Sequence, residues 1–190
     1  SRLAQVADST IATVTADASS PTVRVNSLNL GGSSAVTLLI DTSAVVSGAI
    51  TLSSGGTLNQ GTTHQFLAAS MSLLPGSILR SRSNSTTRQY VVNIAVTGDF
   101  DLAAGATISV QGRGYAAGAS GCAGVVGGGT GGGGGGTLIT RAGGAGGGHG
   151  GAGGAGGDGT TPAGGAAYET AAAPTDLGSG GGGAFSLACS

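Results

Sequence analysis

The sequence predicts a mainly β protein in two parts. The first is a β-solenoid (parallel β-helix-like) or a jelly-roll-like β-sandwich, and the second is an ordered glycine-rich segment. Three observations predict this fold: an apolar spacing that recurs along the first half, a charged content of only 8% with 3% aromatics, and a sharp rise in glycine at Gly112. Of the 42 glycines, nine precede Gly112 and 33 fall from there onward. We therefore divide the chain into residues 1–20, 21–111 and 112–190.

Residues 1–20 are predicted to form a polar, β-prone arm. Val6, Ile11 and Val14 stand among several threonines, without a match to the repeat described below and without a helix cap signal. Such an arm either packs on its own domain or adds a strand to the sheet edge of a neighbouring subunit. Because the chain starts at Ser1 rather than Met, we interpret it as a processed chain or a fragment.

Residues 21–111 contain a repeat of apolar pairs. The residues of each pair are two apart, which places both side chains on one face of a strand. Three positions further on comes a small residue, mostly glycine, which allows a corner with positive φ, and after three more positions an apolar residue. The four copies, at steps of 22, 21 and 29 residues, are Leu28-x-Leu30 with Ser33 and Val36, Ile50-x-Leu52 with Gly55 and Leu58, Met71-x-Leu73 with Gly76 and Leu79, and Phe100-x-Leu102 with Gly105 and Ile108.

Two folds accommodate this repeat. A step slightly above twenty residues is typical of one coil of a β-solenoid, in which each coil buries its apolar stripe against the next. An antiparallel sandwich or jelly roll with regularly spaced hairpins also has short strands at such intervals. We favour the solenoid because the corner glycine keeps its phase in three of the four copies. The polar segment 80–88 is expected to form a loop that leaves the stack and faces water.

The glycine-rich part, residues 112–190, shows a period of three. His149, Ala152, Ala155 and Asp158 are each three residues apart and separated by glycine. Three residues per turn is the period of the polyproline II helix. The segment is therefore expected to be polyglycine II-like or loop-rich, in contrast to the flexible linker that glycine-rich composition usually indicates.

The two cysteines, Cys122 and Cys189, are predicted to form one disulfide that closes this region. No CxxC motif and no metal-ligand partner lies near either of them, so an exported protein with a disulfide is the favoured interpretation. Two free buried thiols are the alternative.

Glycosylation is predicted at four positions. Asn84-Ser85-Thr86 is an N-glycosylation sequon on the expected exposed loop. Thr160, Thr161 and Thr175 lie beside prolines, as in O-glycosylated segments.

The composition argues against several function classes. All seven basic residues are Arg and the net charge is −1, so phosphate neutralisation on nucleic acid and Lys-containing phosphate loops are excluded. Asp99 and Asp101 share a strand face and suit acid–base catalysis or calcium binding, but a solvated strand entrance is favoured. His64 and His149 have no partner at ligand spacing. We therefore predict no enzyme, no metal and no cofactor.

Membrane insertion and ice binding are also disfavoured. No apolar run approaches the roughly 18 residues of a membrane-spanning helix. Ice binding would require a repeated rank of threonines, and the first half contains a single Thr-x-Thr, Thr13-Val14-Thr15.

Three motifs of the second half carry a resemblance. They are the runs 112–118 (Gly-Arg-Gly-Tyr-Ala-Ala-Gly), 149–151 (His-Gly-Gly) and 173–183 (Ala-Pro-Thr-Asp-Leu-Gly-Ser-Gly-Gly-Gly-Gly). Over residues 98–184 the chain resembles glycine-rich secreted surface and fibril proteins with β-repeat domains. More loosely, it resembles the protomers of glycosylated extracellular fibrils, which implies filament assembly with glycans on the outside.

Together these observations predict a structural, non-enzymatic subunit of an extracellular filament or surface matrix. Its partners would be copies of itself, held through β-strand and glycine-rich contacts, and covalently attached glycans. The alternative is a carbohydrate- or surface-binding adhesin or tail-fibre-like module.

Overall fold

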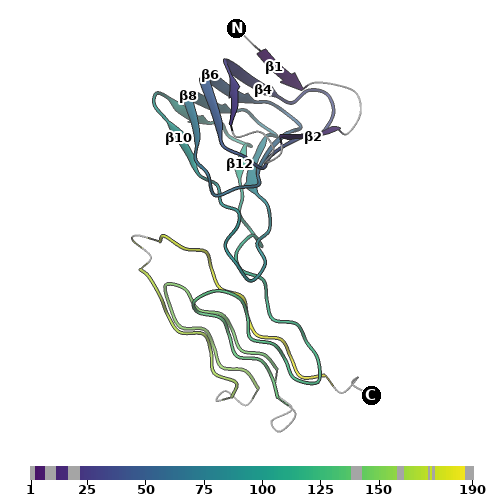
Figure 1. Ribbon diagram of the computed structural model, residues 1–190, viewed down its shortest axis with the longest axis vertical. Coiled ribbons are helices and arrows are strands. Elements are labelled where there is room, and N and C mark those ends of the chain that lie inside the picture. Colours follow the sequence, from purple (N-terminus) through teal and green to yellow (C-terminus); the bar gives the residue numbers. More distant parts are fainter. Residues whose placement is uncertain are drawn as a thin grey trace. The chain divides into compact units, whose positions relative to one another are not determined.

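The computed structural model describes residues 3–6, 12–16, 22–137, 143–157, 161–170, 172 and 174–186. The chain divides into two compact units (Figure 1). The β unit comprises Ser1–Arg82 and Gln89–Gln111, and the glycine unit comprises Ser83–Arg88 and Gly112–Ser190. The change from one unit to the other after Gln111 coincides with the rise in glycine content.

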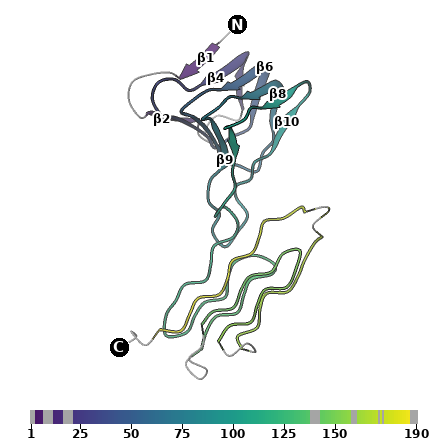
Figure 2. The same cartoon turned by 180° about the vertical axis from the view of Figure 1, so that it is seen from behind.

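The β unit holds all the strands found in the described part of the chain, and no helix occurs there, so the mainly β prediction is confirmed. The strands form two parallel sheets, in the orders β1-β4-β6-β8-β10 and β12-β9-β7-β5-β2, with β3 added to β6 and β11 added to β8 (Figures 1 and 2). Their bounds are β1 Leu3–Val6, β2 Ala12–Ala16, β3 Val23–Val25, β4 Ser27–Leu30, β5 Val36–Ile40, β6 Ala44–Leu52, β7 Gly56–Gln60, β8 Phe66–Leu73, β9 Ile78–Ser81, β10 Ile94–Val96, β11 Phe100–Leu102 and β12 Thr107–Ile108.

The register of the first sheet follows the sequence repeat. Leu28 pairs with Ile50, Ile50 with Met71, and Met71 with Phe100, so the first apolar residue of each copy lies beside its counterpart. Leu52 pairs in the same way with Leu30 and Leu73. Each copy of the repeat therefore contributes one strand segment to a parallel ladder.

In the second sheet the structure contradicts one of the alignments that the sequence repeat predicts, that of Val36 with Leu58. Leu58, Leu79 and Ile108 are in register as expected, but Leu38 pairs with Leu58 where the repeat placed Val36. The connection from β4 to β5 has two residues more than the later corners, which displaces the following strand by one side-chain pair on the same face. A fixed spacing could not reveal this longer corner.

The corner glycines adopt the conformation that the repeat predicts. Gly55, Gly76 and Gly105 have φ values of 74°, 78° and 86°. Their corners lie over one another, because the Gly55 N–H donates to the Gly76 carbonyl (3.2 Å) and the Gly76 N–H to the Gly105 carbonyl (2.9 Å). A Cβ on Gly55 would also lie 2.7 Å from the Ser34 carbonyl oxygen. Glycine is required there for both backbone conformation and space.

The expectation that residues 1–20 lie outside the repeat is wrong. β1 pairs with β4 and β2 pairs with β5, both parallel, so the arm adds one further repeat to its own β unit. Ala4 and Val6 are in register with Leu28 and Leu30. The repeat is hard to recognise there because Ala4 occupies a position where the later copies carry larger apolar residues.

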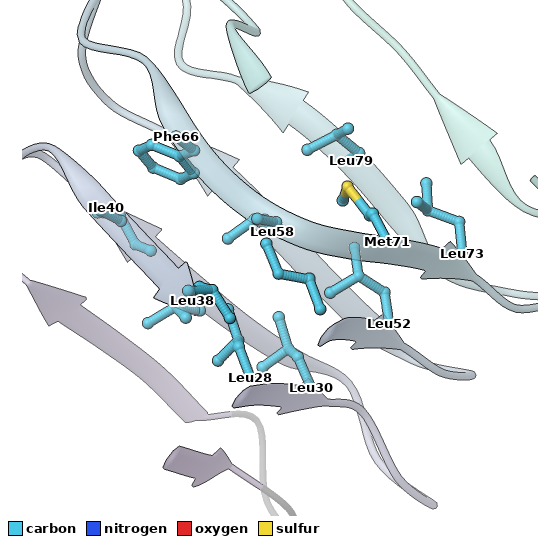
Figure 3. Close-up of a cluster of buried hydrophobic side chains, with 14 of the residues drawn as sticks. Leu28, Leu30, Leu38, Ile40, Leu52, Leu58, Phe66, Met71, Leu73 and Leu79 are labelled. Atoms are coloured by element: carbon cyan, nitrogen blue, oxygen red, sulfur yellow. The ribbon is translucent and has the colours of Figure 1, made fainter. Parts of the chain in front are cut away.

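The core of the β unit lies between the two sheets (Figure 3). Alternate residues of the inner strands point into it, as in the buried–intermediate alternation of β5. Fully burying one such aliphatic side chain contributes about 1.5–3 kcal/mol. The labelled members of the cluster are Leu28, Leu30, Leu38, Ile40, Leu52, Leu58, Phe66, Met71, Leu73 and Leu79.

Several fully buried residues of the β unit are polar, and the largest of them is Gln60. Gln60 occupies the same register position as Ile40 and Ser81. Its Nε2 donates to the carbonyl oxygens of His64 (2.7 Å) and Asn93 (3.2 Å), and its Oε1 accepts the Asn93 N–H (2.8 Å). The side chain thereby ties the loop before β8 to the segment before β10.

The predicted loop 80–88 is not a loop on the β unit. Arg80 and Ser81 belong to β9, and Ser83–Arg88 belongs to the glycine unit. There the Ser85 carbonyl accepts the N–H of Ala116 at 2.9 Å. The 29-residue step of the repeat thus contains a segment that contributes to the second unit.

The glycine unit consists of extended segments whose hydrogen bonds recur every three residues. Gly124 and Gly127 donate to Gly136 and Gly133, respectively, which run in the opposite direction. The same period links 133–136 to 180–183 through the bonds Gly133 to Gly180 (3.1 Å) and Gly136 to Gly183 (2.9 Å). This is the spacing of a helix with three residues per turn, and each segment bonds to several neighbours. Figures 1 and 2 show these segments side by side.

In this unit the extended segments pack so closely that backbone atoms of one segment leave no room for side chains on the next. A Cβ on Gly144, Gly165 or Gly182 would lie less than 3.0 Å from a neighbouring carbonyl oxygen, closer than real side chains approach. By contrast, Gly151 and Gly154 face open space. Glycine is therefore a steric requirement at the inner positions.

Candidate functional site

The predicted glycosylation sites differ in accessibility. Asn84 is only 7% exposed and its Nδ2 donates to the Arg113 carbonyl oxygen at 2.7 Å, so the expectation that this side chain faces water is wrong. Thr161 and Thr175 are exposed, whereas Thr160 lies outside the described residues. The two described threonines are therefore the accessible candidates for glycan attachment.

Cys122 is disulfide-bonded. The other cysteine of the chain, Cys189, lies outside the described residues, so its pairing with Cys122 stays a prediction.

Asp99 and Asp101 lie at the last strand of the larger sheet. Asp101 is exposed in β11 opposite Ser72, and the Asp99 carbonyl accepts the N–H of Met71. Within the described ranges, no group of three His, Cys, Asp or Glu side chains is placed to hold a metal ion.

A polar cluster in the glycine unit brings together side chains that are far apart in the sequence. Its centre is Glu169, which has a positive φ of 61°. The Glu169 carboxylate accepts the backbone N–H groups of Thr175 (2.9 Å) and Asp176 (3.0 Å) as well as the Thr175 hydroxyl. The Thr175 hydroxyl bond and the Asp176 backbone bond hold the pKa of Glu169 below its ordinary value.

His149 closes one side of this cluster. Its Nε2 lies 3.5 Å from the Glu169 carboxylate and 3.3 Å from the Asp176 carbonyl oxygen. The imidazole ring meets the Tyr168 ring edge to face, with centroids 4.9 Å apart. His149 has no partner at metal-ligand spacing in the sequence, and these contacts join it to residues about twenty positions and more along the chain.

Tyr115 and Arg88 form the other side. The Tyr115 hydroxyl donates to the Asp176 carboxylate at 2.9 Å, and burial together with this carboxylate raises the pKa of Tyr115. Arg88 donates to the Thr175 carbonyl (2.8 Å) and lies 3.9 Å from the Asp176 carboxylate. Because these polar groups bind one another, the cluster fixes segment 174–179 against the rest of the glycine unit. The runs 112–118, 149–151 and 173–183, which the sequence singled out, each contain a residue of this cluster.

A column of threonines crosses the second sheet, although no repeated Thr-x-Thr occurs. Thr13, Thr37 and Thr57 are in register, and the column continues through Ile78 to Thr107. Thr57 is buried, however, so the described column does not present a continuous exposed array. The sequence pattern missed it because each threonine belongs to a different strand.

The strongest candidate for an interaction surface is the last repeat of the β unit, formed by β11 and β12 and here called the open end. Phe100 (47%), Leu102 (48%), Ile108 (43%) and Val110 (55%) are exposed. The residues in register below the first three are Met71, Leu73 and Leu79, which are buried. The apolar columns of the core thus continue into side chains that no further repeat covers in the described part of the chain.

The backbone of the open end is also unpaired on one side. Thr107 and Ser109 donate their N–H groups to Ser77 and Leu79 of the preceding repeat. Because N–H directions alternate along a strand, the N–H of Ile108 points away from the sheet. An edge of this kind is a template for pairing with another strand.

No protein-family model matches the chain, and no curated protein or solved structure was found to be similar to it. Over the described ranges, no helix has the length and apolar character needed to cross a membrane.

Proposed function

We propose that this chain is a structural subunit of an extracellular filament or surface matrix. In this proposal the β unit is a β-solenoid, and the glycine unit is a polyglycine II-type bundle. The parallel, in-register strands support the first assignment, and the three-residue period of the hydrogen bonds supports the second.

The observation that carries the proposal is the open end of the β unit. A parallel repeat that stops at exposed Phe100, Leu102 and Ile108 has both an apolar surface and free backbone groups for a further strand. Repeat proteins need either a capping segment or a partner at such an end. Self-association meets this need and extends the structure in one direction.

The proposed role is non-enzymatic. The chain has eight acidic residues and two histidines. In the glycine unit Glu169, Asp176 and His149 are engaged with one another and with backbone groups. This arrangement suits a role in holding the backbone.

An extracellular location is part of the proposal. A disulfide at Cys122 is typical of proteins that fold in an oxidising compartment. Of the two exposed threonines at predicted glycosylation sites, a glycan is proposed on Thr161, because the Thr175 hydroxyl that would carry the sugar donates to the Glu169 carboxylate. At Asn84 a glycan would have to displace the bond to the Arg113 carbonyl, so we do not propose it there.

Electron microscopy of the purified protein at neutral pH, with and without reductant, tests this proposal. We expect regular filaments or a lattice whose repeat is close to the length of one subunit. Discrete particles at every concentration would contradict it.

A carbohydrate-binding module is the second candidate. It is favoured by the polar cluster, where Arg88, with a side chain 42% exposed, lies beside tyrosine and carboxylate groups that commonly bind sugars. Glycan-array binding that is lost in Arg88→Ala and retained in Arg113→Ala would favour this function.

A further inference from the structure

We propose that the open end of one β unit binds the β1–β2 edge of a second copy of this chain, so that the parallel ladders of both sheets continue from copy to copy. This inference rests on the proposed structural function and specifies its interface.

The two ends are equivalent positions in the same ladders. In the smaller sheet β2 is one edge and β12 the other, and in the larger sheet β1 and β11 occupy corresponding positions of the first and last repeats. All described pairs of strands are parallel. A second copy displaced along the stack therefore presents β1 and β2 in the direction that β11 and β12 require.

The apolar columns are continuous across this junction. Ala4 and Val6 occupy the register positions of Phe100 and Leu102, through the chain of pairs from β1 to β11. A second copy would thus bring the strand positions of Ala4 and Val6 beside those of Phe100 and Leu102. Burial of Phe100 and Leu102 then supplies an apolar driving force, and the backbone edge sets the register.

A second β unit fits this edge better than the glycine unit does. In the described part of the glycine unit no named strand occurs, so it offers no extended edge with the hydrogen-bond spacing of β11 and β12. The interface joins different surfaces of the two copies. Such a head-to-tail contact generates a filament when the rotation between copies does not close a ring.

Cysteine cross-linking tests the register. Continuing the column through Thr37, Thr57 and Ile78 predicts that Thr13 of one copy lies opposite Thr107 of the next. Neighbouring strands place paired residues within reach of a disulfide. We expect covalent dimers when Thr107→Cys and Thr13→Cys chains are mixed under mild oxidation. As the matched control, Thr37→Cys, which lies in an inner strand, replaces Thr13→Cys in the mixture and should give no covalent dimer.

A backbone variant tests the same interface in full-length protein. Ile108→Pro removes the outward N–H while leaving those of Thr107 and Ser109 intact, and proline is tolerated at such edges. We expect it to raise the critical concentration for assembly by more than about tenfold. Ile108→Ala, which keeps the N–H, should raise it by a smaller factor. Circular dichroism and thermal unfolding check that both variants fold.

The outcomes separate this interface from the wider proposal. Cross-linked dimers together with loss of filaments in folded Ile108→Pro protein are the expected result. Normal filaments in Ile108→Pro and no cross-link would overturn the interface but leave the structural function standing. Should Ile108→Pro not fold, the cross-link alone decides. Absence of filaments in the wild-type chain, together with absence of a cross-link between the Thr107→Cys and Thr13→Cys variants, would overturn both.

Discussion

The carbonyl oxygen of Gly134 lies where the side chain of any other residue at position 182 would begin. Gly182 in turn donates its N–H to the Ala145 carbonyl at 2.8 Å, so its backbone has little freedom to move away. The same close approach recurs at many glycines of this unit. Carbonyl oxygens there fill the space that side chains occupy in an ordinary core.

Gly182→Ala should destabilise the glycine unit by about 3 kcal/mol, because the added methyl overlaps backbone rather than a movable side chain. Gly154→Ala is the matched control. Its Cβ meets nothing within 4 Å, so we expect a change below about 1 kcal/mol. Denaturant unfolding of both variants measures the difference. Equal stabilities would show that the inner segments are not packed backbone against backbone.

Gly76→Ala should destabilise the β unit by about 1–2 kcal/mol, since an L-residue is strained at a φ of 78°. Gly76→Asn should lose less, because asparagine adopts this conformation more readily. Thermal unfolding of the two variants provides the comparison. An alanine variant as stable as the wild type would argue against the corner conformation.

Gln60→Leu should cost about 2–4 kcal/mol even though leucine suits an apolar core. The substitution leaves the His64 carbonyl and both backbone groups of Asn93 without their side-chain partner, and each such loss costs about 1–3 kcal/mol. Gln65→Leu, at an exposed position, is the control and should change stability little. If both variants unfold at the same denaturant concentration, Gln60 does not tie the loops together.

The glycine unit should lose stability in acid through Glu169. Its pKa is lowered in the folded protein, so its contribution is present above the ordinary value of 4.5 and is lost as the pH falls through the folded pKa. Unfolding measured between about pH 7 and pH 2 should show this loss. Glu169→Gln removes the titrating group, and its stability should change less with pH. A variant with the same acid dependence as the wild type would assign the effect to another carboxylate.

Much of the β unit could be predicted because its repeat appears in the sequence as a regular pattern of apolar residues and glycines. The pairs beginning at Leu28, Ile50, Met71 and Phe100 fall in register, and three of the corners use a glycine with positive φ. The first repeat was missed where Ala4 replaces a larger residue. The longer corner before Val36 was missed because extra residues on a surface leave the hydrophobic pattern unchanged.

The polar cluster could not be predicted, because its contacts join distant positions in a glycine-rich chain. Tyr115 and Asp176 are 61 residues apart, and Glu169 binds backbone groups, which carry no sequence signal. The same limit applies to Asn84. Its sequon is recognisable, but its burial depends on a bond to the backbone of Arg113.

The open end could be recognised only once strand register was known. Phe100, Leu102 and Ile108 follow the same pattern as the buried residues of earlier repeats, so the sequence gives no reason to expect them exposed. Their exposure arises from their place in the last repeat.

Fibre diffraction from aligned assemblies tests the central claim most directly. If successive copies continue the parallel ladders, the strands stack along the filament axis and a meridional reflection at about 4.8 Å is expected. Filaments without a meridional reflection near this spacing, or a protein that stays in discrete particles at every concentration, would contradict the account.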